Sequence, residues 1–218
     1  MPSSTPSTPS TSSSPFPTSA SPDLVLDFWL GDGLTLGWPS QDMGKRWFNG
    51  GPELDEEIRR TFGTLVEQAL AGGLAGWEAQ PLSRLALVIL LDQFPRNIFR
   101  GKGEAFAGDE QAQRLVSEAL AQGLDEALPW VGRVFLYMPL THAENLALQE
   151  EGVRRFSALA AAVPEAHRAS AQGSLDFAVK HRDIVARYGR FPHRNTALGR
   201  TSSALEFEFL KIGPRFGQ

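Results

Sequence analysis

The sequence contains no cysteine, and this absence excludes three kinds of chemistry. Without thiols there can be no disulfide framework, no thiolate nucleophile and no zinc site with cysteine ligands. A chain that needs no disulfides suits a reducing compartment, so we expect a cytoplasmic protein.

Positive charge is also missing from the beginning of the chain, where the first basic residue is Lys45. A secretory signal needs a basic start and an apolar run of about 7–15 residues, and neither is seen. No stretch approaches the roughly 20 apolar residues of a membrane-spanning helix. The net charge of −4 and the pI near 5.6 argue against general binding to nucleic acid or anionic membranes. We therefore expect a soluble protein with neither nucleic-acid nor membrane partners.

Residues 1–22 have little that could form a core. All but three of them are Ser, Thr or Pro, and Phe16 is the only large apolar residue after Met1. Such a segment buries too little apolar surface to offset the entropy lost on ordering, so a disordered tail is predicted. Residues 23–218 are expected to form a single domain.

The rest of the chain shows helical periodicity nearly everywhere and no convincing strand. About eight helices are expected, with residues 34–51 as a loop rich in Gly and Trp. They begin at Pro22, at Pro52, near 81, at an Asp109 cap, at Pro129, at a capping box from Thr141 to Glu144, near 165, and at a capping box from Ser203 to Glu206. Mostly short links predict an all-α fold of antiparallel helix pairs.

The segment LLDQFPRNIFRG, residues 90–101, ends a helix that is apolar on all sides and is therefore predicted to lie between other helices. Because a residue before proline avoids α-helical geometry, this helix should end near Gln93 or Phe94. Asp92 would then lie in the last turn, where the helix dipole disfavours a carboxylate, so it needs a cationic partner. Either these polar residues form part of a site, or they only bond free carbonyls at the helix end. The residues are Asp92, Gln93, Arg96, Asn97 and Arg100.

A second Phe-Pro segment, ARYGRFPHRN at 186–195, follows a later helix. It lies in a basic cluster with one acid, Asp183, and close guanidinium groups bind carboxylates and phosphates through paired hydrogen bonds. The alternative is that these residues pair with Asp or Glu on neighbouring helices. If the cluster forms a site, the two Phe-Pro segments should meet in space. Its members are His181, Arg182, Arg187, Arg190, His193, Arg194 and Arg200.

His142 and Glu144 form a third candidate, since an imidazole beside a carboxylate can transfer protons. However, Glu144 is placed to accept from the Thr141 amide as a helix cap. No HExxH pairing occurs, so no metal is expected, and the absence of a glycine-rich phosphate loop gives no reason to expect a cofactor. The five tryptophans are predicted to lie in the core.

Together, LDFWLG, RWF, LLDQFPRNIFRG, AFAGD, LYMPLTHAENLALQE and HRDIVARYGRFPHRNTALGR resemble the uncharacterised bacterial domain-of-unknown-function family 924 over residues 24–216. The resemblance implies an all-α fold similar to the right-handed superhelix of tetratricopeptide-repeat proteins, without a regular repeat signature, and no established activity. The sequence departs from the family pattern at Ala143 and Asn145.

Two functions remain open. The first is a small-molecule enzyme or binding protein with an Arg/His-lined pocket for a carboxylate or phosphate ligand. The second is a helical-repeat scaffold that binds a peptide or protein partner in its concave groove. The sequence specifies neither a reaction nor an oligomeric state. For the first function, catalytic roles fall to Asp92, His142 and His181, and ligand-binding roles to Gln93, Arg96, Asn97, Arg100, Arg187, Arg190, His193 and Arg194.

Overall fold

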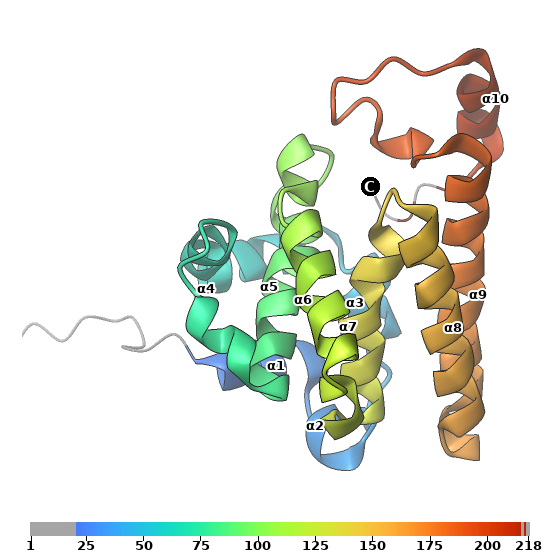
Figure 1. Ribbon diagram of the computed structural model, residues 1–218. Coiled ribbons are helices and arrows are strands. Elements are labelled where there is room, and N and C mark those ends of the chain that lie inside the picture. The colour runs from blue at the N-terminus through green and yellow to red at the C-terminus, as the bar shows by residue number, and fades with distance from the viewer. Residues whose placement is uncertain (1–20, 215, 217–218) are drawn as a thin grey trace, which may run out of the picture.

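In a computed structural model, the described residues, 21–214 and 216, form ten α-helices and four short 3-10 helices, and none of them forms a strand (Figure 1). The α-helices are α1 (Pro22–Leu30), α2 (Gly33–Leu36), α3 (Gly44–Asn49), α4 (Gly51–Leu70), α5 (Pro81–Ile98), α6 (Asp109–Ala121), α7 (Trp130–His142), α8 (Leu146–Ala162), α9 (Glu165–Tyr188) and α10 (Ala204–Ile212). The all-α prediction is confirmed. The number of helices exceeds eight because α3 forms inside the predicted loop, residues 34–51, and α2 forms at its beginning. The predicted tail, apart from Ser21 and Pro22, lies outside the described residues.

Helix α5 is the central element of the core. Every side chain from Arg84 to Pro95 is buried, and the helix packs against α1, α4, α6 and α7. This confirms that a helix apolar on all sides lies between others. Its carboxyl end carries Asp92 and Arg96 into the middle of the protein.

The predicted end of this helix is wrong, because α5 continues through Pro95 to Ile98. Proline at 95 has no N–H to donate to the Leu91 carbonyl. Gly108 packs against that carbonyl instead, so closely that a Cβ there would lie 2.3 Å from the Leu91 oxygen. The turn after Pro95 also buries Asn97 and Ile98, and this packing keeps it helical.

Helices α8 and α9 are joined only by Val163 and Pro164, and they lie side by side at one end of the protein (Figure 1). Helix α9 also contacts α7, and α10 lies beyond its carboxyl end. The Ser203–Glu206 capping box of α10 is confirmed. None of the helices in the described part of the chain is both long and apolar enough to span a membrane.

Two other predicted helix caps are wrong: the Thr141–Glu144 capping box and the Asp109 cap. Helix α7 continues past Pro139 to His142, and α8 is capped by Asn145, whose side chain accepts from the Leu148 amide at 3.2 Å. Glu144 is engaged by a different part of the chain. Helix α6 begins at Asp109 itself after Gly108, and the Asp109 carboxylate binds arginines rather than backbone amides.

Candidate functional site

A cavity of about 800 Å³ lies among the ends of α5 and α7, helix α9 and the segment 38–50. The first Phe-Pro segment, residues 90–101, and the two inward histidines supply its polar wall. These residues are Gln93, Arg96, Asn97, Arg100, His142 and His181. The aromatic wall consists of Trp38, Trp47, Phe48, Phe156, Phe177 and Phe216. Trp29 is fully buried in the core, as predicted, and the other four tryptophans are half-buried and pack against it; of these, Trp38 and Trp47 also line the cavity.

The central feature of the polar wall is a hydrogen bond between His142 and Asp92. Nδ1 of His142 lies 2.8 Å from Asp92 Oδ1 and 3.0 Å from Oδ2, and Asp92 is fully buried. A carboxylate only accepts, so Nδ1 carries the proton and Nε2 has a free lone pair. Asp92 occupies the Nδ1 side of the ring and His142 lines the cavity, so Nε2 is the ring nitrogen left for a ligand.

The protonation states of this pair follow from their surroundings. Burial by itself raises the pKa of Asp92, but the positive Arg96 and hydrogen bonds from His142 and Gln93 together hold it well below its usual range. Burial lowers the pKa of His142, and Arg96 opposes the raising effect of Asp92. The pair is therefore an aspartate anion beside a neutral imidazole, which is the form that a general base requires.

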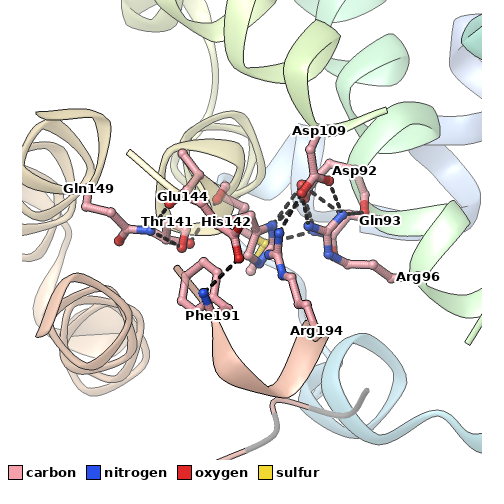
Figure 2. Close-up of polar contacts among 12 residues, drawn as sticks. Asp92, Gln93, Arg96, Asp109, Thr141, His142, Glu144, Gln149, Phe191 and Arg194 are labelled. Carbon is pink, nitrogen blue, oxygen red and sulfur yellow. Dashed lines mark hydrogen bonds and ion pairs between the residues drawn. The ribbon is translucent and has the colours of Figure 1, made fainter. Parts of the chain in front are cut away.

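Asp109 joins the two Phe-Pro segments (Figure 2). Arg96 Nη2 donates to Asp109 Oδ2 at 3.1 Å, and Arg194 Nη1 donates to the same oxygen at 3.0 Å. Arg96 also lies 3.2 Å from Asp92 Oδ1 and donates to the Asp92 carbonyl at 2.6 Å. The predicted meeting of the two segments is thus found, and a carboxylate from α6 is what joins them.

His181 is the second histidine of the cavity wall. Its Nδ1 donates to the Phe177 carbonyl at 2.7 Å, which leaves Nε2 as an acceptor. Burial and the neighbouring His142 lower the pKa of His181 to about 3, so the ring is neutral at pH 7. The His142 and His181 ring centroids are 5.9 Å apart. Within the described residues, no group of three or more His, Asp or Glu side chains is arranged to hold a metal ion.

The position of His142 is fixed by residues after α7. Gln149 is fully buried, and its Nε2 donates to the carbonyls of Thr141 and Ala143, both at 2.7 Å. Glu144 accepts from the Phe191 amide at 2.7 Å (Figure 2). It also accepts from Arg200 at 2.5 and 2.9 Å. These bonds attach the loop after α9 to the end of α7, and Glu144 therefore joins chain segments rather than capping a helix.

The remaining predicted ligand-binding residues do not line the cavity. Arg187 is exposed beside Tyr188, and Arg190 pairs with Glu206 at 2.7 Å. His193 and Arg194 lie behind the wall, where Arg194 is buried between the rings of Phe106 and Phe191. The basic cluster is therefore partly a set of structural ion pairs, which was the alternative interpretation of its charge.

The sequence predicted the wrong role for two carboxylates that hold the site together. Asp109 and Glu144 both resembled helix caps, because a carboxylate near a helix start has that local signature. Their partners, Arg194 and Arg200, lie far along the chain. A surplus of arginines in an acidic protein was the available signal, but it does not specify which acid pairs with which base.

The fold and this cavity define an all-α protein with an aspartate–histidine pair at the wall of a small-molecule-sized pocket. The chain belongs to the family described as bacterial protein of unknown function (DUF924), whose model matches residues 25–213. It is similar to a solved protein of unknown function from Agrobacterium tumefaciens, with 34% identity and a TM-score of 0.74 over 88% of this chain and 97% of that one. No curated protein matches the chain.

Proposed function

We propose that the protein is a small-molecule enzyme in which His142 acts as a general base on an anionic ligand held in the cavity. The observation that carries the proposal is the bond between the buried Asp92 and His142 Nδ1 at the cavity wall. Asp92 fixes the tautomer and stabilises the imidazolium that forms when Nε2 takes a proton. His181 lies beside His142, and its Nε2 can accept a hydrogen bond from the ligand.

Arg96, Asn97 and Arg100 are the residues proposed to bind the acidic group of the ligand. Arg100 Nε and Nη2 bind Asp55 at 2.8 and 2.9 Å, and its side chain is 38% exposed at the cavity. Arg96 forms ion pairs with Asp92 and Asp109, and these two carboxylates largely neutralise its charge. A carboxylate or a single phosphate suits such a wall better than a polyanion. Absence of cysteine is consistent with action in the cytoplasm.

The test offers a panel of carboxylic acids and phosphate monoesters to the protein. Solvent-deuterium exchange reports a proton taken from the ligand, and hydrolysis reports a proton taken from the attacking water. The wild type should convert at least one member, and His142→Gln should lower the rate at least about a hundredfold. Because the pKa of His142 lies below the ordinary histidine value of about 6.5, the rate should hold at neutral pH and fall only at more acidic pH, where protonation of His142 removes the base. A His142→Gln protein as active as the wild type, or a wild type that binds panel members without converting any, would contradict the proposal.

A second candidate is a tetratricopeptide-like superhelix that binds a peptide or protein in its groove. Phe48 and Phe177 favour it, because both line the cavity while their side chains are 52% and 54% exposed. Exposed aromatic residues are common anchors for peptides. Peptide binding would be lost in Phe48→Ser and unchanged in His142→Gln, which separates this function from the enzyme.

A further inference from the structure

Phe216 occupies an aromatic slot at the cavity. Its ring lies flat on His181, with centroids 3.9 Å apart and planes 25° apart. The rings of Phe177 and His193 meet it edge-on, at 6.3 and 5.6 Å. We call His181, Phe177 and His193 the aromatic slot.

The slot favours a neutral planar group. Burial and nearby positive groups lower the pKa values of His181 and His193 to about 3, so both imidazoles are uncharged at pH 7. Uncharged rings at these distances stack through their faces and edges, which an aliphatic group of the same size cannot do as well. The slot thus selects for ring shape rather than for charge.

Phe216 is not part of the main core. It packs as a half-buried residue against the small cluster of Ile184, Val185 and Phe191. Helices α1 and α4–α9 contribute to a separate, larger cluster that does not include it. Removing this ring should therefore leave the packing around α5 unchanged.

The polar wall lies next to the slot. His181 is 5.9 Å from His142 between ring centroids, and Asp92 connects His142 to Arg96. His181, His142 and the two arginines Arg96 and Arg100 line the same cavity, so a ring stacked on His181 shares that space with the polar wall. Resting on the function proposed above, we propose that the ligand is an aromatic acid whose ring replaces Phe216 against His181.

The experiment measures binding and ring stacking together. The probes are 2-naphthoate, cyclohexanecarboxylate, which keeps the acid without a π face, and 2-naphthylmethylamine, which keeps the ring with the opposite charge. The proteins are the wild type, Phe216→Ala and Phe216→Leu. Phe207→Ala is the matched control, because Phe207 is 58% exposed on α10 and does not line the cavity. The readouts are affinity by calorimetry and the ring-proton shift of His181 by NMR.

Removing the Phe216 ring should move the His181 resonance downfield, and 2-naphthoate should restore its upfield position. Binding of 2-naphthoate should tighten roughly tenfold in Phe216→Ala, which corresponds to one stacked ring no longer competing. Phe216→Leu keeps apolar bulk without the ring. As in Phe216→Ala, the upfield shift of His181 should be lost in this variant and restored by 2-naphthoate. Phe207→Ala should match the wild type.

Equal binding of 2-naphthoate and cyclohexanecarboxylate, tighter binding of the amine than of the acid, or a His181 resonance indifferent to Phe216 would each overturn the inference. These outcomes are separable from failure of the enzyme proposal, which His142→Gln reports through the conversion rate. His142→Gln leaves every residue of the slot in place. An aromatic acid that stacks on His181 but is not converted would therefore contradict only the proposed reaction.

Discussion

Arg96 and Arg194 donate hydrogen bonds to the same oxygen of Asp109, although they come from opposite halves of the chain. Both guanidinium groups are almost fully buried, with side chains 11% and 7% exposed. A single carboxylate thus holds the end of α5 and the loop after α9 together. The cavity wall depends on this arrangement, because Arg96 also contacts Asp92.

Replacing Asp109 with Asn should therefore be strongly destabilising. The change leaves two buried guanidinium groups without their shared anion, which typically costs about 3–5 kcal/mol in free energy of unfolding. Urea denaturation measures this loss. Asp176→Asn is the control, because Asp176 is exposed on α9, and it should change stability by less than about 0.5 kcal/mol. A loss below about 1 kcal/mol for Asp109→Asn would show that Asp109 does not hold the two segments.

Gly108→Ala tests the close approach to α5. An added Cβ would lie 2.3 Å from the Leu91 oxygen, so backbone must shift, and about 1–3 kcal/mol of stability should be lost. Gly63→Ala is the matched control, because a Cβ at this position inside α4 meets nothing within 4 Å. It should stabilise the protein by about 0.5–1 kcal/mol through higher helix propensity. Similar effects of the two changes would contradict the packing described for Gly108.

The buried histidines predict an acid-sensitive stability. In the folded state, burial lowers the pKa of His181 and of His193 to about 3, whereas unfolded histidine titrates near 6.5. The unfolded chain therefore binds protons that the folded protein does not, and stability falls as pH decreases from about 6.5 towards 3. Each histidine contributes a slope approaching about 1.4 kcal/mol per pH unit near pH 5.

Urea denaturation between pH 7 and 4.5 measures this slope above the range where most carboxylates titrate. His181→Asn keeps a donor for the Phe177 carbonyl but cannot be protonated, so its slope should be smaller than that of the wild type. His193→Asn should reduce the slope independently. Curves parallel to the wild type for both variants would show that these histidines are protonated in the folded protein.

Arg190 should stabilise helix α10 rather than bind the ligand. It donates to both Glu206 oxygens and to the Thr201 carbonyl, and Glu206 belongs to the capping box of α10. In Arg190→Gln, hydrogen exchange of the α10 amides should become faster, while ligand affinity in the cavity stays the same. Arg187→Gln is the control and should alter neither, because Arg187 is exposed beside Tyr188. A loss of ligand affinity without faster hydrogen exchange in α10 would show that Arg190 binds the ligand.

The sequence was sufficient to predict the all-α class and the burial of Leu85–Leu91, because helical periodicity and an unbroken apolar run are local signals. It also indicated that the two Phe-Pro segments would meet. It misplaced the end of α5, because the rule against helical geometry before Pro95 is local, while the packing of Gly108 and Asn97 is not.

Only the tertiary structure decided how the charges pair. Asp109 and Glu144 have the local pattern of helix caps. Their carboxylates nevertheless bind Arg194 and Arg200, which lie 85 and 56 residues further along the chain. The tertiary structure also decided that Trp38 and Trp47, which pack against the core, line the cavity with their other side. Residue type and spacing determine which secondary structure forms, whereas a buried carboxylate takes whichever cation the packed helices bring within hydrogen-bonding distance.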